Sequence, residues 1–427
     1  MKLRRLLGSW WTAARPDRQV PGTLLLAPFG KVRLRLHGTL SDRRIGLIER
    51  ETFPVILGIS MKGRRVTLHD CDLVGRSGLE LGQITHYAVN EAYVGAHFEE
   101  PTGPPAVRHV QAEYSDLLNW VRFSPWAASH NLDVDILSEP RGITWRPDIS
   151  LSASHQGATL TLTSWMEPEG RFHEDVRVRR RLSLGIESPE PLTTYEWHRR
   201  YLHPFRHFLA LGTTRATTLS SFTVIPDIPE GGVPQLVSVF NYYIGPSVKG
   251  PKWFTPSDAL FHLGDIEGSF STVLARWFVV YEKLRPVCDQ FFGLAYNPPT
   301  YVDQRLLTLV SAAEAYHRET VGPRKGLSLH DRLTSLLGRA DDIAGPLVKD
   351  RAAFLKQVVR TRNMLTHLTT KDAHQIPGPN AIYRLSRTLN FVLRRCLLRD
   401  LELAPEQCQA LFARNRDYIW AKEDVSV

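Results

Sequence analysis

The stretch GPSVKGPKWFTP, residues 245–256, divides the sequence into two parts with different patterns of apolar residues. It holds three prolines and two glycines, residues that interrupt helices and strands alike. Short runs that alternate between apolar and polar residues precede it, and longer runs with a helical period follow it. We therefore predict a β-rich N-terminal domain over residues 1–245, a linker over 246–260 and a helical domain over 261–427.

Upstream of this linker, the sequence predicts short strands separated by glycine and proline. Residues 55–59 and 65–69 flank the turn-forming stretch MKGR at 61–64, which predicts a hairpin. The pattern of residues 193–211 instead predicts one helix that is kinked or split at Pro204. Further strands are predicted at 23–26, 32–36, 110–114, 158–163, 176–184, 221–225 and 235–243.

Downstream of the linker, apolar residues recur with a helical period. A run of strands followed by a run of helices favours an α+β chain, here a β-rich N-terminal domain followed by an all-α helical bundle. The helices are predicted at 269–292, 301–319, 327–337, 350–367 and 381–403.

Lysine and arginine outnumber aspartate and glutamate by 53 to 44, which gives a formal net charge of +9. This excess favours polyanionic partners, but it is spread along the chain and fits an ordinary solvated surface equally well. No stretch reaches the roughly 18 consecutive apolar residues of a membrane span, so we expect no membrane partner. The start MKLRRLL resembles a signal peptide only briefly, and the four cysteines form no CxxC pair. These features favour the reducing cytoplasm.

The sequence RNMLTH at 362–367 holds an arginine, an asparagine and a histidine at close range. At about 100° per residue, Asn363 and His367 share one face of a helix, whereas Arg362 and His367 diverge by about 140°. Arg362 and His367 can therefore address one phosphate only if the helix ends or bends between them, or if a second copy faces it across a dimer axis. The residues that follow are poor helix formers, so we predict that the helix ends near His367.

A candidate partner for Arg362 lies on the predicted neighbouring helix. Glu314 lies beside the apolar stripe of that helix, and a carboxylate near a core is costly unless a cation pairs with it. We predict that Arg362 is this cation. The pairing would fix the guanidinium and leave some of its five donors for a phosphate.

These side chains suit RNA cleavage without a metal ion or another cofactor. A 2′-hydroxyl would attack the adjacent phosphorus and leave a 2′,3′-cyclic phosphate. His367, with a reference pKa of about 6.5, would take the hydroxyl proton or protonate the leaving 5′-oxygen. Arg362 would stabilise charge on the phosphoryl oxygens, and Asn363 would orient the histidine or the phosphate. Because one histidine cannot easily perform both proton transfers, we expect a symmetric homodimer.

The string R-x4-H is weak evidence by itself, because a chain with 53 lysines and arginines and 16 histidines contains chance matches. In a structural interpretation, Arg362 only braces helices and His367 interacts with the helix dipole. Two further alternatives are a non-catalytic module that binds RNA or a nucleotide, and a structural dimerisation protein.

Arg362, Asn363 and His367, late in a helical bundle, resemble the motif of the HEPN superfamily of metal-independent ribonucleases. Segments 306–317, 329–333 and 389–403 are similar to the acidic, middle and closing helices of the Apea-like HEPN branch. The front segments GSWW at 8–11, PGTL at 21–24 and LRLHG at 34–38 resemble the β-rich domain that precedes HEPN in ApeA-type phage-defence proteins.

This resemblance implies a ribonuclease of abortive infection, which cuts RNA when phage infection is sensed. RNA would be the substrate, and the β-rich domain would recognise a phage-derived trigger or restrain the nuclease. The resemblance also implies that Arg362, Asn363 and His367 form the catalytic motif, with Glu314 as its acidic partner.

Other patterns are less specific. His203 and His207 have the i, i+4 spacing of a zinc site, but the intervening Pro204 and the lack of a nearby carboxylate or cysteine favour aromatic packing, also for His198. Alternate arginines at 177, 179 and 181 form either a nucleic-acid stripe or a solvated strand face, and the basic loop 323–326 either guides RNA or is an exposed turn. Glycine loops of the Walker or Rossmann type and a G-x-S-x-G elbow are absent from the sequence.

Overall fold

The computed structural model describes residues 4–27, 31–41, 51–77, 83–98, 103–122, 126–128, 143–145, 150–171, 175–227, 235–245, 254–298, 301–322, 326–367 and 377–426. The chain forms two compact units. The first comprises residues 1–118, 123–206 and 218–249, and the second comprises 119–122, 207–217 and 250–427. The chain is α+β, with a strand-rich N-terminal region followed by a helical C-terminal region, as the sequence predicted.

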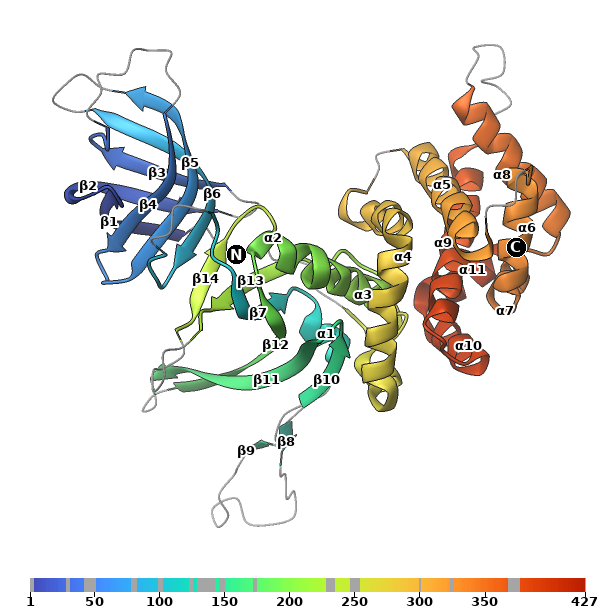
Figure 1. The fold of residues 1–427 in the computed structure, drawn as a ribbon. Helices are drawn as coiled ribbons and strands as arrows, with labels where there is room; N and C mark the ends of the chain where they lie inside the picture. The colour runs from blue at the N-terminus through green and yellow to red at the C-terminus, as the bar shows by residue number, and fades with distance from the viewer. Residues whose placement is uncertain are drawn as a thin grey trace, which may run out of the picture. The chain divides into compact units, whose positions relative to one another are not determined.

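The first unit is built on one 12-stranded sheet with the order β10-β11-β12-β7-β13-β14-β6-β3-β2-β1-β4-β5. Strand β6 also pairs with β5, so β1 to β6 close into a barrel (Figure 1). The separate strands β8 (Trp126–Ala128) and β9 (Ile143–Trp145) pair with each other. The sheet strands are β1 (Arg4–Thr12), β2 (Arg15–Leu26), β3 (Val32–His37), β4 (Thr52–Ser60), β5 (Arg65–Ser77), β6 (Ile84–Val94), β7 (Val107–Tyr114), β10 (Ser150–His155), β11 (Ala158–Arg171), β12 (Asp175–Leu192), β13 (Leu219–Ile225) and β14 (Val237–Phe240).

The barrel core follows from the alternation of apolar side chains along its strands. The predicted hairpin is confirmed: β4 and β5 pair antiparallel around a turn in which Gly63 has a φ of +73°, a conformation that favours glycine. Trp10 is fully buried, and Gly58 makes room for its ring, because a Cβ at residue 58 would lie 2.3 Å from a ring atom. The remaining core includes Leu24, Leu34, Ile56, Leu68 and Tyr87.

The predicted helix at 193–211 is present but is not broken at Pro204. Thr193 caps α2 (Thr194–Trp197) in a capping box with Glu196, a π-helical turn spans His198–Leu202, and α3 (His203–Thr213) follows directly. The irregularity thus lies in the turn before Pro204, where the amide of His203 bonds to the carbonyl of His198. The wider π turn accommodates the proline ring without ending the helix.

A buried carboxylate ties this helix to the sheet within the first unit. Glu91 on β6 is only 6% exposed. It accepts hydrogen bonds from Tyr93 Oη, Thr194 Oγ1 at 2.7 Å and Asn241 Nδ2 at 2.7 Å. Three donors from different segments satisfy the charge, so Glu91 joins β6, the start of α2 and the residue after β14.

We expect Glu91→Ala to lower the stability of the first unit by about 3 kcal/mol, because it leaves three buried donors without their charged acceptor. Thermal unfolding of the full chain measures this as a drop in the melting temperature of the β-rich transition. Glu190→Ala removes an exposed glutamate of the same unit and should leave that transition unchanged. Equal melting temperatures for the two variants would show that the Glu91 network contributes nothing to stability.

The second unit is a helical bundle in which α5 packs against α4, α6, α8 and α9 (Figure 1). All five predicted helices are present, and α4 bends where Leu284 leaves the helical conformation two residues before Pro286. The helices α7, α10 and α11 were not predicted. The helices after the linker are α4 (Phe270–Tyr296), α5 (Val302–Val321), α6 (Leu329–Arg339), α7 (Asp341–Ala344), α8 (Arg351–Thr366), α9 (Pro379–Asp400), α10 (Pro405–Arg414) and α11 (Arg416–Ser426), and the short α1 (Leu117–Val121) lies upstream.

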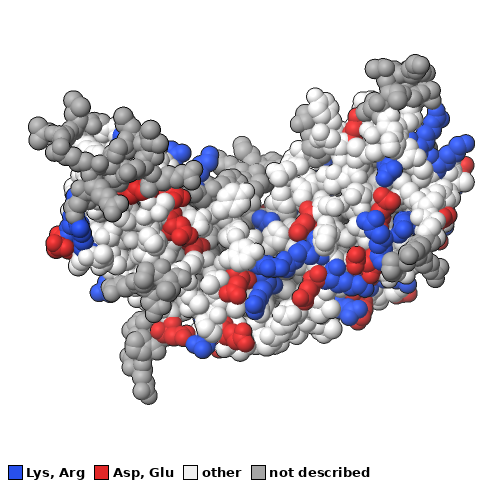
Figure 2. All heavy atoms as spheres, turned by 45° about the horizontal axis from the view of Figure 1, so that its top comes forward, with Lys and Arg blue, Asp and Glu red and all other residues white. Residues whose placement is uncertain are grey.

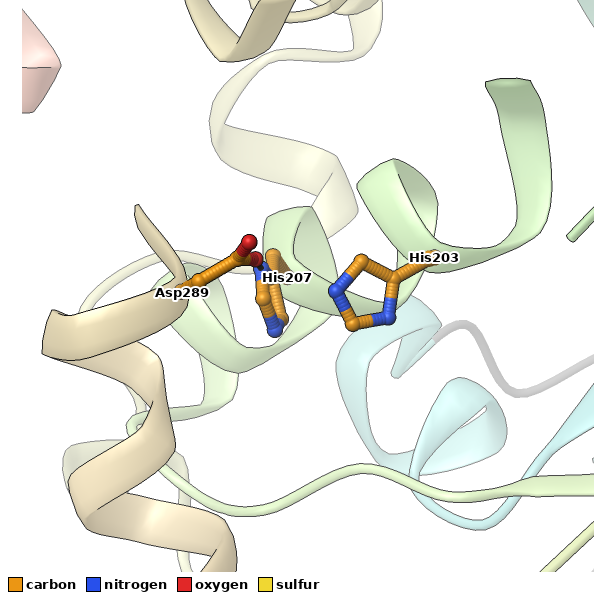
Figure 3. A group of neighbouring side chains, drawn as sticks. All are labelled: His203, His207 and Asp289. Carbon is orange, nitrogen blue, oxygen red and sulfur yellow. Dashed lines mark ion pairs between the residues drawn. The ribbon is translucent and has the colours of Figure 1, made fainter. Parts of the chain in front are cut away.

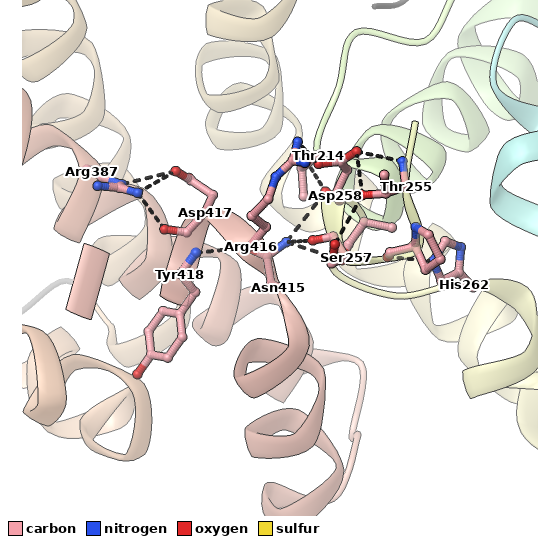
Figure 4. A network of polar contacts seen from close by, with 12 residues as sticks. Thr214, Thr255, Ser257, Asp258, His262, Arg387, Asn415, Arg416, Asp417 and Tyr418 are labelled. Carbon is pink, nitrogen blue, oxygen red and sulfur yellow. Dashed lines mark hydrogen bonds and ion pairs between the residues drawn. The ribbon is translucent and has the colours of Figure 1, made fainter. Parts of the chain in front are cut away.

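Residues 255–265, which span the end of the predicted linker, are held by the last two helices of the chain in a polar network that we term the C-terminal clamp (Figure 4). Asn415 Nδ2 donates to the carbonyl of Ala259 at 3.2 Å, and Arg416 forms an ion pair with Asp258. Asp265 binds Arg414 through two ion-pair contacts, one of 2.7 Å, and accepts from the His262 amide at 2.7 Å.

Asp265 should make the clamp sensitive to acid. Burial alone would raise the pKa of Asp265, but the bonds from Arg414 and the His262 amide outweigh it and lower the pKa below the usual 3.8. A lowered pKa in the folded state means stabilisation that is present above the unfolded pKa and is lost as pH falls through the folded value.

We therefore expect Asp265→Asn to lower the melting temperature of the helical unit at pH 7, and this deficit should shrink as pH falls below about 4. Melting curves between pH 7 and pH 3 measure it. Glu267→Gln, at an exposed neighbouring position, serves as the control. A deficit that stays constant across this range would contradict the assignment.

Candidate functional site

The candidate motif lies at the C-terminal end of α8. Asp350 caps the start of this helix by accepting from the Ala353 amide at 2.9 Å. Leu355, Val358, Thr361 and Leu365 are its buried side chains, and they hold it in the bundle. The helix ends at Thr366, so it stops where the sequence predicted.

His367 is the first residue beyond the helix, with φ −115° and ψ 37°. Its amide still bonds to the carbonyl of Asn363 at 2.9 Å, and its side chain is exposed. The imidazole therefore lies at a helix terminus, where water and a ligand can both reach it.

Arg362 is held by two neighbours. Its Nη1 donates to Asn363 Oδ1 at 3.1 Å, and its Nη2 lies 3.9 Å from Glu314 Oε2 on α5. The side chains of Arg362 and Glu314 are 33% and 23% exposed, so their ion pair is partly screened by water. The structure thus brings together Arg362, Asn363 and Glu314.

Arg362 and His367 are less directly related. Within the described part of the helical unit, no hydrogen bond joins their side chains. Because α8 remains helical through Thr366, the two side chains leave the helix in directions about 140° apart. The helix ends at His367 and not between Arg362 and His367, so a helix end does not by itself bring the two side chains to one phosphate. A second copy of α8 that faces the first across a dimer axis stays a prediction.

A groove of about 640 Å³ adjoins the motif and contains residues that the sequence reasoning missed. The spacing of Lys356 and Arg360, which lie on the same helical face as Asn363, is the sequence pattern that could have indicated this groove. The groove runs between α6 and α8, and its lining consists of His330, Ala352, Lys356, Val359, Arg360, Asn363 and Met364.

The overall positive charge does not by itself locate a site. On the face shown in Figure 2, lysine and arginine side chains are interspersed with aspartate and glutamate side chains. On β12, Arg181 pairs with Glu167 at 2.8 Å and Glu113 at 3.7 Å, so this member of the arginine stripe has a structural partner. The side chain of Arg177 and residues 323–325 of the basic loop lie outside the described residues.

The histidines of the helix before the linker lie in aromatic surroundings. His207 is 2% exposed and stacks on Phe292 with ring centroids 4.8 Å apart. The expectation that no carboxylate is near was wrong, because Asp289 Oδ1 of α4 lies 4.0 Å from His207 Nδ1 (Figure 3). This contact joins residues 82 positions apart in sequence, so only the packing of α3 and α4 reveals it.

His198, in the first unit, stacks on Tyr243 with ring centroids 3.7 Å apart. Burial, followed by the positive charges of His203 and Arg206, lowers the pKa of His198 to about 2. This imidazole is therefore neutral at physiological pH and packs as an aromatic ring, as the sequence predicted.

The four cysteines, Cys71, Cys288, Cys396 and Cys408, are buried and unpaired. Among the described residues, none of the helices combines the length and the apolar character needed to cross a lipid bilayer.

Comparison with known families covers both parts of the chain. The family model ApeA N-terminal domain 1 matches residues 5–277, which is more than half of the chain. The model Apea-like HEPN matches residues 307–407, which include Glu314 and the whole of α8. Searches of curated proteins and of solved structures find no match. The chain therefore belongs to the ApeA-type HEPN proteins, an assignment that supports a role in anti-phage defence.

Proposed function

We propose that the protein is a metal-independent HEPN endoribonuclease that acts in abortive-infection defence. The observation that carries this proposal is the end of α8. An exposed imidazole, His367, lies one helical turn after Asn363, whose side chain binds a guanidinium that Glu314 also contacts. Positive charge at the phosphate and a proton-transfer group both accelerate RNA cleavage by a 2′-hydroxyl, and the end of α8 holds one of each.

In the proposed reaction, His367 removes the proton of the 2′-hydroxyl or protonates the leaving oxygen. The new bond joins the 2′-oxygen to phosphorus, and the bond from phosphorus to the 5′-oxygen breaks. The products are a 2′,3′-cyclic phosphate and a free 5′-hydroxyl. Arg362 supplies the positive charge that a metal ion would otherwise bring to the phosphoryl oxygens.

The second proton transfer calls for a second group. We propose that a homodimer provides it, because the two copies of α8 would bring two imidazoles to one cleft. The first unit would bind a phage-derived trigger or restrain the nuclease. Reduced, buried cysteines fit a cytoplasmic protein that meets phage RNA and host RNA directly.

Purified full-length protein incubated with single-stranded RNA in the presence of a chelator tests the proposal. We expect fragments with 2′,3′-cyclic phosphate and 5′-hydroxyl ends, and the same ends in RNA from infected cells that carry the protein. If infection produces no such ends in cells, and RNA is bound intact by the purified protein, the non-catalytic RNA-binding alternative replaces the nuclease.

A further inference from the structure

We propose that the groove between α6 and α8 binds single-stranded RNA and leads it to the motif at the end of α8. This inference rests on the proposed ribonuclease function and names where its substrate lies. Asn363 is the link, because it lines the groove and also binds Arg362.

Polar and basic side chains align along α8 from the groove to the motif. Lys356, Arg360, Asn363 and His367 occupy positions i, i+4, i+7 and i+11, which fall within an arc of about 60° on a helix. The stripe is about 16 Å long at about 1.5 Å per residue. It begins in the groove with two cations and ends at the exposed imidazole. Arg362, which faces Glu314, lies outside it.

Basic side chains predominate among the polar residues that line the groove. Lys356 and Arg360 are exposed, and His330 of α6 adds a third basic group. The described residues that line the groove include no carboxylate. Asp331, next to His330 in sequence, places its Oδ1 3.9 Å from His330 Nδ1, so this histidine has a carboxylate partner and the positive charge of the groove comes from Lys356 and Arg360. The groove therefore offers positive charge to phosphates.

Part of the groove lining is apolar. Ala352, Val359 and Met364 provide a surface against which a base or a ribose can pack. Base faces are accessible in a single strand and are hidden in a duplex. A groove that combines this apolar surface with cations therefore fits single-stranded RNA better than double-stranded RNA.

A second groove on α8 provides an internal comparison. It has a volume of about 610 Å³ and lies between α8 and α9. Arg384 is its only basic lining residue among those described, and no residue of the motif lines it. Because the two grooves are similar in size, size does not distinguish them. The groove between α6 and α8 is the better candidate for RNA binding because it carries more basic side chains and because Asn363 of the motif lines it.

Binding should be measured separately from cleavage, with a fluorescent 2′-O-methyl RNA oligonucleotide that lacks the attacking hydroxyl. We expect Lys356→Ala/Arg360→Ala in the full-length protein to weaken binding about tenfold. The slope of log affinity against log salt should fall by about 1.4, since each phosphate contact in a single strand contributes about 0.7. The matched control Lys349→Ala/Arg384→Ala also removes one lysine and one arginine from exposed positions and should bind within about twofold of wild type.

The outcomes separate this inference from the proposed function. If wild type cuts unmodified RNA but the groove variant binds the probe as tightly as the control does, the groove is not the binding site and the nuclease stands. If the groove variant loses binding while wild type leaves RNA intact, the groove binds RNA without cleavage. If light scattering shows that the groove variant has lost an oligomeric state that the control keeps, the groove is an interface between copies, and the inference is overturned.

Discussion

His367→Ala is expected to reduce the rate of RNA cleavage by roughly 10²–10⁴-fold, the range for loss of a general acid or base. The side chain lies beyond the last turn of α8 and is exposed, so the same change should leave the melting temperature of the helical unit unaltered. Single-turnover cleavage of a defined RNA, with ends identified by sequencing, measures the first quantity, and thermal unfolding measures the second.

Thr366→Ala provides the matched control for this variant. Thr366 is the exposed neighbour of His367, and its hydroxyl donates to the carbonyl of Arg362 at 2.7 Å, the one hydrogen bond it makes within the described residues. Cleavage should remain close to wild type in this control. Full cleavage by His367→Ala would instead favour the structural interpretation, in which the imidazole merely ends a helix.

Arg362→Ala is expected to slow cleavage by a similar factor, because it removes the positive charge that stabilises the phosphoryl oxygens. Arg362→Lys should restore only part of the rate, since an ammonium cannot reproduce the fixed fork of a guanidinium. Binding of the uncleavable 2′-O-methyl RNA should fall much less than the rate, because the strongest contact is expected in the transition state. These rates and affinities together distinguish a catalytic arginine from a binding arginine.

Glu314 tests whether Arg362 acts through its position. At 3.9 Å and partly exposed, the Arg362–Glu314 pair should contribute at most about 1 kcal/mol to stability, so Glu314→Gln should fold normally. If Glu314 serves only to hold Arg362, the double variant Glu314→Gln/Arg362→Ala should cleave RNA no more slowly than Arg362→Ala alone. Additive losses would show that Glu314 has a separate role in the reaction.

Much of the helical unit could be predicted from the sequence because its helices are long and strongly periodic. The end of α8 near His367 also followed from local sequence, since the residues after it are poor helix formers. The helices α10 and α11 were missed because their burial depends on distant partners. Tyr418, for example, donates to the carbonyl of Ile343 on α7 at 2.8 Å.

The strands that were missed failed for a similar reason. Strand β1 begins with a run that resembles a signal peptide, and only its pairing with β2 and β4 gives it a place in the barrel. Strand β6 alternates in burial over its first six residues, but the polar residues Thr85 and Glu91 occupy buried positions, so the sequence shows no clear alternation of apolar and polar residues. Pairing partners far apart in sequence are invisible to local patterns.

In the candidate site, too, some features could be predicted from local sequence and others depend on contacts between distant segments. The contact between Arg362 and Glu314 could be predicted from helical periodicity, whereas Arg362, Asn363 and His367 stood out through their closeness in sequence and the family resemblance. The groove could not be predicted, because it depends on how far His330 on α6 lies from α8. Asp289 beside His207 is another contact that only tertiary packing creates.

The C-terminal clamp has a mechanical consequence. Arg387 on α9 donates to the carboxylate and the carbonyl of Asp417, which directly follows Arg416, the partner of Asp258. Residue 258, four positions after Phe254, is therefore linked through Arg416 and Asp417 to both α11 and α9. Since α9 also packs against α8, a displacement of the chain at residue 258 would be passed through α9 to the helix that ends at His367.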